Sequence, residues 1–161
     1  MDGVVLSIAL GVVIVGSLAY NPRLWINDAP PRVRALTAPL TARERRDRNI
    51  VAALFLVTLV AVAVWSAGRL FARYAESVPV AVVFGHFLGV MFLFNLFDLV
   101  VIDWLMLLVM RPAFIQRLHV PGLSYEETVG SYGYHFRAFL KGMGFVVLFS
   151  LVATLAVFLV G

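Results

Sequence analysis

The chain contains no cysteine and few charged residues, and each of these absences excludes a class of protein. Without cysteine there is no disulfide, thiolate metal site, thiol nucleophile or Cys-based redox switch. Charged residues make up 14% of the 161 residues and hydrophobic residues 62%, against roughly 25% and about 45–50% in soluble domains. This composition excludes a soluble globular domain, a disordered chain, a collagen and a coiled coil. The length allows one domain, so we predict a single membrane domain over residues 1–161.

Four apolar runs reach the roughly 17–25 residues that a membrane-spanning helix needs. They cover residues 4–20, 50–68, 80–110 and 143–160. The sequence therefore predicts an all-α polytopic membrane protein, a bundle of four transmembrane helices. Because the first run follows the acidic start Met1-Asp2-Gly3 and not a basic one, we expect it to be retained and not cleaved as a signal peptide. The third run would make a helix of about 46 Å at 1.5 Å per residue, so we expect it to tilt, kink or project.

Basic residues are divided unequally among the connecting segments. Residues 21–49 hold seven arginines, residues 111–142 hold four basic residues, and the segment between the second and third runs holds only Arg69 and Arg73. Because Lys and Arg in short loops stay on the cytoplasmic side, we predict that both longer loops are cytoplasmic and both termini outside, in a multi-pass protein of the cell inner membrane. The formal charge of +4 then indicates topology and contact with anionic lipids, and gives no support for nucleic-acid binding.

Local signals divide the two long loops into short pieces. One long helix over the first loop is excluded by its prolines, Pro22, Pro30, Pro31 and Pro39. Thr41 with Glu44, and Ser124 with Glu127, match the capping box that begins a helix. Glu44 is also spaced to pair with Arg48. We expect Gly130 and Gly133 to interrupt the helix that follows Ser124.

Polar side chains inside a membrane are costly unless they are paired or wet, and the third run carries four of them. They are His86, Asn95, Asp98 and Asp103. At the 3.6 residues per turn of an α-helix, Asn95 and Asp98 share a face, whereas Asp98 and Asp103 lie about 140° apart. We expect His86 to hydrogen-bond a neighbouring helix. The Gly85–Gly89 pair has the small-residue spacing that lets two helices approach closely.

The two aspartates have two interpretations. In the structural one, they form ion pairs at the inner membrane surface with a basic residue, the candidates being Arg48, Arg111, Arg137 and Lys141. In the functional one, they belong to a polar pocket at the cytoplasmic ends of spans two to four, which binds a cation, a proton or a lipid headgroup. The predicted ligand-binding residues are Asn95, Asp98, Asp103, His135, Arg137 and Lys141, the last two as a counter-charge or anion clamp.

Sequence motifs of known enzyme classes are absent, including G-x-S-x-G, H-E-x-x-H and the phosphate-binding glycine loops. Four side chains on the second long loop could meet around a metal ion: His119, Glu126, Glu127 and His135. Their spacing matches no zinc motif. We therefore predict no catalytic residue, no metal and no cofactor.

Several segments carry a resemblance to known proteins. They are Asn21-Pro22-Arg23-Leu24-Trp25, Asn95-Leu96-Phe97-Asp98 with Asp103-Trp104, Pro121-Gly122, Tyr134-His135-Phe136-Arg137 and Phe139-Leu140-Lys141-Gly142. Together they resemble a group of small four-span bacterial membrane proteins without an established activity. The resemblance covers most of the chain and implies a bacterial inner-membrane protein, but no chemistry.

The sequence thus predicts an integral inner-membrane protein that acts as a binding, permeation or accessory protein. The expected partners are membrane lipids, anionic lipids among them, and either a second copy of the chain or a larger membrane protein. The alternative is a membrane-embedded enzyme acting on a lipid or prenyl-type substrate at the cytoplasmic interface. In that case His135 is the candidate acid or base, because its ordinary pKa near 6.5 suits proton transfer.

Overall fold

The computed structural model describes residues 1–74, 78–118 and 120–160, and this part of the chain has an all-α fold with no strand. Helices account for 84% of the structure. In chain order they are α1 (Asp2–Tyr20), η1 (Pro22–Asp28), α2 (Pro31–Leu36), α3 (Ala42–Phe71), α4 (Val80–Phe97), η2 (Asp98–Met110), η3 (Ile115–Leu118), α5 (Tyr125–Val129) and α6 (Tyr132–Val160). Four helical segments are long and apolar enough to cross a membrane: α1, α3, the continuous α4–η2 and α5–α6. The predicted all-α fold with four such helices is confirmed.

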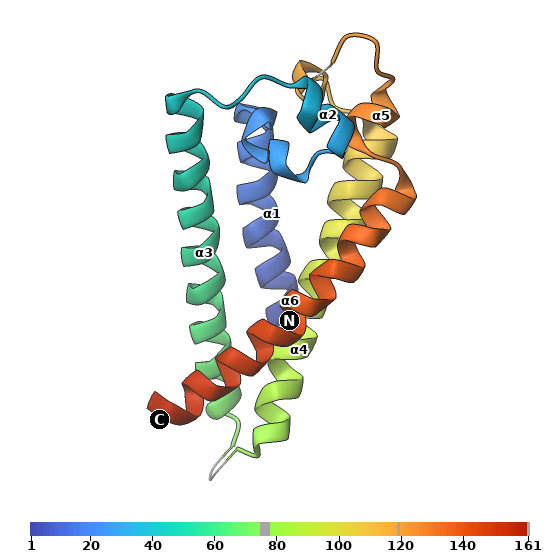
Figure 1. The fold of residues 1–161 in the computed structure, drawn as a ribbon. Coiled ribbons are helices and arrows are strands. Elements are labelled where there is room, and N and C mark those ends of the chain that lie inside the picture. Colours follow the sequence, from blue (N-terminus) through green and yellow to red (C-terminus); the bar gives the residue numbers. More distant parts are fainter. Residues whose placement is uncertain (75–77, 119, 161) are drawn as a thin grey trace.

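The four long helices pack as a bundle in which α1 lies between α3 and α4, and α6 crosses α4 (Figure 1). The segments 21–41, 111–118 and 120–131 gather at one end of the bundle, which we call the loop end. All four helices contribute to one apolar core, through residues such as Leu10, Leu59, Met91 and Val146. The loop end is therefore the place where polar loops cover the ends of apolar helices.

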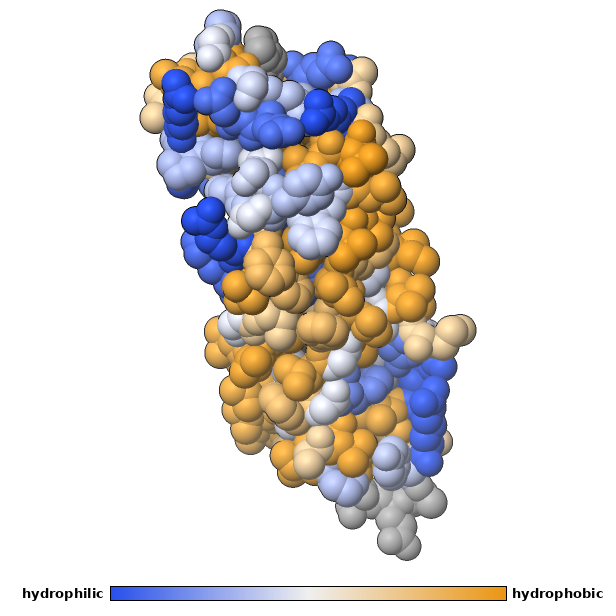
Figure 2. All heavy atoms as spheres, turned by 90° about the vertical axis from the view of Figure 1, so that its right-hand side faces the viewer, coloured by the Kyte–Doolittle hydropathy of each residue, from blue (hydrophilic) through white to orange (hydrophobic). Residues whose placement is uncertain are grey.

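The outer faces of the long helices are apolar. Large hydrophobic side chains are exposed along α3 and α6, among them Leu54, Val57, Leu148 and Leu155. Figure 2 shows hydrophobic residues over the middle of one face, with hydrophilic residues gathered at the loop end. An exposed apolar surface of this extent is typical of helices that face lipid. Four helices that could cross a membrane suggest a multi-pass membrane protein.

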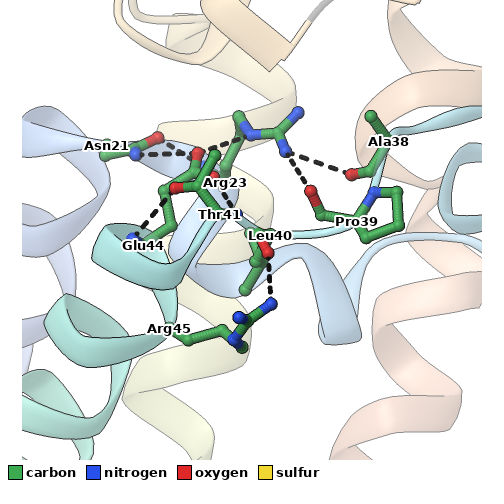
Figure 3. Close-up of polar contacts among 8 residues, drawn as sticks. All are labelled: Asn21, Arg23, Ala38, Pro39, Leu40, Thr41, Glu44 and Arg45. Atoms are coloured by element: carbon green, nitrogen blue, oxygen red, sulfur yellow. Dashed lines mark hydrogen bonds and ion pairs between the residues drawn. The ribbon is translucent and has the colours of Figure 1, made fainter.

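Both predicted capping boxes are confirmed, one at the start of α3 and one at the start of α5. The predicted pairing of Glu44 with Arg48 is wrong, because Glu44 accepts from Arg23 Nε at 2.7 Å (Figure 3). The Arg23 guanidinium also donates to the carbonyls of Ala38 and Pro39. These contacts tie the first loop to the beginning of α3. The loop itself is broken into η1 and α2, as its prolines predict.

Close approach between helices occurs at glycines other than the predicted pair. A Cβ at Gly85 or Gly89 would meet nothing within 4 Å, so the predicted close packing at these two residues is wrong. By contrast, a Cβ at Gly3 would lie 2.7 Å from Leu93, and one at Gly142 would overlap Asn95 Oδ1. The small residues that matter therefore lie on α1 and α6, where these helices face α4. Gly133 lies inside α6, so only Gly130 ends the short helix α5, against our expectation for both.

The second half of the third span is not an α-helix. Residues 98–110 form the π-helix η2, in which hydrogen bonds run from residue i to i+5. Side-chain donors bond two of its last carbonyls: Tyr125 Oη donates to Leu107 O at 2.7 Å, and Arg111 Nε to Leu108 O at 3.1 Å. The α-helical pitch assumed for this segment is therefore wrong, and so is the angular separation calculated from it.

Far from the loop end, a polar cluster joins the beginning of α1 to α3 and α4. The buried carboxylate of Asp2 accepts from Ser66 Oγ at 2.8 Å and pairs with Arg69 at 3.1 Å. Ser66 Oγ also lies 2.7 Å from His86 Nε2. This confirms that His86 hydrogen-bonds a neighbouring helix. Because His86 presents the same nitrogen to Ser66 and to Asp2, the cluster lacks the relay arrangement of a nucleophilic triad.

Candidate functional site

A cavity of about 310 Å³ lies at the loop end, between α1, η2 and the beginning of α6, and beneath η1. Its walls are largely aliphatic and aromatic. The polar exceptions include three carboxylates and one imidazole. The side chains that line it are Ile14, Leu18, Pro22, Trp25, Asp28, Ala29, Phe55, Phe94, Asp98, Ile102, Asp103, Leu107, Ile115, Leu118, Thr128, Val129, Tyr134, His135 and Ala138.

The π-helical pitch of η2 brings two carboxylates to this cavity. Asp98 and Asp103 are five residues apart, which is the spacing of one i to i+5 turn, so both can face the same side. Both line the cavity. An α-helix would have turned them well apart. The unusual helix is therefore what makes a shared acidic wall.

The third carboxylate that lines the cavity, Asp28, comes from η1. Desolvation by the surrounding protein raises the pKa of Asp28, and the negative charge of Asp103 raises it further, while Arg34 lowers it. The cavity thus concentrates negative charge in a place where ionisation is costly. A positively charged occupant would relieve that cost.

His135 joins the acidic wall from α6. Its Nδ1 lies 3.0 Å from Asp103 Oδ2, and the residue is only 6% exposed. Its other ring nitrogen, Nε2, is buried and has no hydrogen-bond partner in the described part of the chain. Buried polar atoms are nearly always paired, so an unpartnered one beside a cavity is a place to look for a ligand.

The roof of the cavity is held by specific contacts. Trp25, which lines the cavity from η1, donates its indole N–H to Ser17 Oγ at 2.9 Å. Tyr134 Oη donates to the backbone carbonyl of Asp28 at 2.8 Å, which joins η1 to α6. The Arg23–Glu44 pair anchors the beginning of η1 to α3 (Figure 3). Residues 22–28 therefore form a fixed cover, held from three helices.

The structure brings together three of the six predicted ligand-binding residues. Asp98, Asp103 and His135 all line the cavity. Asn95 does not: its Nδ2 donates to the backbone carbonyl of Phe139 at 3.1 Å, which fastens α4 to α6. Ligand binding by any of the six stays a prediction.

The two predicted basic residues are on the outside. Arg137 and Lys141 are exposed on α6, and neither lines the cavity. Arg137 Nε donates to the carbonyl of Gly133 at 3.2 Å, on its own helix. The geometry therefore gives no anion clamp beside the carboxylates.

The predicted ion pairs of the two aspartates with a basic residue are also not seen. In the described residues, no Arg or Lys lies within 4 Å of Asp98 or Asp103. Arg111, one of the proposed partners, pairs with Glu126 at 3.3 Å. Asp103 has the imidazole of His135 as its neighbour instead.

Sequence reasoning missed Asp28, Trp25 and Tyr134. One signal could have pointed to Asp28: it is an acid in an arginine-rich loop whose prolines turn the chain back over the helix ends. Of the metal ligands considered, His119 lies outside the described residues. Elsewhere in the structure no group of three or more His, Asp and Glu side chains could hold a metal ion.

Comparison with protein families, with curated proteins and with solved structures finds no match to this chain. The resemblance to small four-span bacterial proteins therefore stays a prediction, and the functional argument depends on the cavity alone.

Proposed function

We propose that this protein is a multi-pass membrane protein that binds a small cationic ligand in the cavity at its loop end. One observation carries the proposal: three carboxylates line a largely apolar cavity to which no Arg or Lys of the described chain contributes. Because little water screens the charges in such a cavity, the carboxylates attract a cation strongly and repel an anion. The volume lies at the low end for small-molecule sites, which favours a compact ligand.

The direct test is ligand binding by the purified protein in lipid nanodiscs, followed by the fluorescence of Trp25, which lines the cavity. Phenethylammonium is a suitable cation, and 3-phenylpropionate is an anion with a similar body. We expect the cation to bind and the anion not to bind. A Trp25→Phe variant identifies the part of the signal that comes from this indole.

Charge removal inside and outside the cavity makes the test specific. Asp98→Asn should weaken binding of the cation about tenfold or more, which corresponds to about 1.4 kcal/mol. Glu126→Gln removes an acid whose side chain is 66% exposed and does not line the cavity, and it should leave the affinity unchanged. Equal effects of the two substitutions, or equal binding of cation and anion, would contradict the proposal.

We further propose that the loop end faces the cytoplasm, on the basis of the basic residues in its two long loops. The absence of cysteine makes this simple to test with single cysteines. Leu36→Cys lies at the loop end, where Leu36 is 57% exposed, and Tyr74→Cys lies after α3, where Tyr74 is 40% exposed. In intact cells a membrane-impermeant maleimide should label the second variant and not the first, and the reverse pattern would invert the topology.

Anionic lipid is the proposed partner outside the cavity, because exposed arginines such as Arg32, Arg43 and Arg46 lie around the loop end. Native mass spectrometry of the protein extracted from its membrane would report bound lipids, a second copy of the chain or a larger partner. Retention of zwitterionic lipids alone would count against anionic-lipid contact.

A second candidate function is an enzyme acting on a lipid or prenyl-type substrate, with the cavity as its active site. The observation that favours it is the His135–Asp103 pair, since a carboxylate that orients an imidazole is a common arrangement for a general base. Incubation with a total lipid extract, followed by mass spectrometry, would test it. A product formed by the wild type and not by His135→Gln would favour the enzyme over the binding protein.

A further inference from the structure

The pairing of His135 with Asp103 decides which kind of group its free nitrogen can bind. Asp103 Oδ2 lies 3.0 Å from Nδ1, and a carboxylate can only accept, so the proton of the neutral imidazole belongs on Nδ1. Nε2 then carries a lone pair and is an acceptor. In the described chain no N–H or O–H reaches it. The site therefore holds an acceptor in need of a donor.

A glycine lies next to this buried nitrogen. Gly130 has a φ of +101°, a conformation that favours glycine, and it ends α5. A Cβ at this position would lie 2.6 Å from Tyr134 Cδ1 and 3.3 Å from His135 Nε2. Any larger residue would thus press on the two ring side chains that α6 contributes to the cavity. Glycine at residue 130 therefore keeps a side chain from pressing on Nε2.

The neighbouring groups are acceptors as well. Asp98 and Asp103 of η2 and Asp28 of η1 all offer carboxylate oxygens to the lining of the cavity. Tyr134 has its hydroxyl hydrogen committed to the carbonyl of Asp28. A ligand that satisfies this wall needs both a positive charge and several hydrogen-bond donors.

We propose that the cation is a protonated primary or secondary amine with a small apolar body. This inference rests on the proposed cation-binding function and specifies its ligand. The ammonium N–H groups donate to His135 Nε2 and to a carboxylate other than Asp103, which a quaternary ammonium cannot do because it has no N–H. A bare metal ion fits less well, since the described residues hold no cluster of three metal-ligating side chains.

The apolar part of the ligand also has a defined place. Phe55 and Phe94 line the cavity and form an edge-to-face pair with ring centroids 6.0 Å apart. Ile14, Leu18 and Ile102 complete this side with aliphatic surface. A phenyl ring or a short branched alkyl group would bury its surface there, with its ammonium at the acidic wall.

The test compares phenethylammonium with its N,N,N-trimethyl derivative, which keeps the charge and the ring but has no N–H. Binding is measured in nanodiscs by the fluorescence of Trp25. We expect the primary amine to bind at least tenfold more tightly to the wild type. His135→Phe should remove this preference. Tyr132→Phe, on the same helix at an exposed residue that does not line the cavity, should retain it.

The ¹⁵N spectrum of labelled histidine supplies a second measurement that needs no variant. Without ligand, His135 should show a protonated Nδ1 and an unprotonated Nε2. The Nε2 signal should shift on addition of phenethylammonium and stay in place with the trimethyl derivative. This readout follows the acceptor nitrogen itself, so it holds even if His135→Phe fails to fold.

The outcomes separate the two proposals. Equal affinities for the two ammonium ions would refute the amine inference and leave the cation-binding function intact. Binding of neither ion would refute both. A tenfold preference that persists in folded His135→Phe would show that the N–H groups are recognised elsewhere, and would overturn the role of His135.

Discussion

Gly142→Ala should destabilise the bundle through one contact between α6 and α4. A Cβ at Gly142 would overlap Asn95 Oδ1 and would lie 3.2 Å from Asn95 Cγ. Asn95 cannot simply turn aside, because its Nδ2 is bonded to Phe139 O at 3.1 Å, on the same helix as Gly142. The methyl group therefore either forces the two helices apart or breaks this hydrogen bond.

The size of the effect follows from the energy of the hydrogen bond and from the cost of overpacking. An interhelical hydrogen bond in a membrane protein contributes about 0.6 kcal/mol on average and at most about 1.7. Overpacking costs about 1–3 kcal/mol, and the gain in helix propensity from Gly to Ala offsets up to about 1 kcal/mol. Gly144→Ala is the matched control, because it has the same propensity gain and its Cβ meets nothing within 4 Å. We expect Gly142→Ala to be about 1–2 kcal/mol less stable than Gly144→Ala.

Unfolding by dodecyl sulfate in mixed micelles, followed by far-ultraviolet circular dichroism, measures this difference. The double-mutant cycle with Asn95→Ala is the decisive part. Once the amide is gone, the clash is gone too, so the double variant should differ from Asn95→Ala only by the helix-propensity gain that Gly144→Ala measures. Effects that add within about 0.5 kcal/mol, or equal stabilities of the two alanine variants, would refute the reasoning.

Three further predictions concern the polar groups. Ser66→Ala removes the hydroxyl bonded to Asp2 and His86 and should lower the free energy of unfolding by about 1–2 kcal/mol, whereas Ser7→Ala, whose hydroxyl bonds only to its own helix, should have little effect in the same unfolding assay. Gly130→Ala should cost at least about 1 kcal/mol because its φ is +101°, and fluorescence titration should show weakened binding of phenethylammonium. Asp28→Asn should stabilise the fold at pH 7. The folded state raises the pKa of Asp28, so its ionisation destabilises that state, and the advantage of the variant should vanish below the ordinary pKa of 3.8 in stability curves against pH.

Much of the architecture could be predicted because it depends on composition and local hydrogen bonding. Four apolar runs are enough to specify four long helices. The capping boxes at Thr41 and Ser124 could be predicted for the same reason, since each involves residues only three positions apart. The breaks in the first loop follow from the fixed backbone of proline.

The candidate site could be predicted only in part. An acid inside a long apolar run is easy to notice, because a charged side chain is costly in a membrane. This signal identifies Asp98 and Asp103 in the sequence. Asn95 is likewise a polar residue within an apolar run, but its side-chain amide holds α6 against α4. An amide that donates to a backbone carbonyl and one that faces a ligand cannot be distinguished before the neighbouring helix is in place.

The sequence by itself determined the number, length and apolar character of the helices, because these follow from residue type and spacing along the chain. Only the tertiary structure decided which polar groups meet. The π-helical pitch of η2 lets both Asp98 and Asp103 line one cavity, and the path of η1 adds Asp28 to its lining. The packing of α6 then puts His135 beside Asp103. The positions of Asp28 and His135 depend on contacts between segments distant in sequence, which no local pattern of residues encodes.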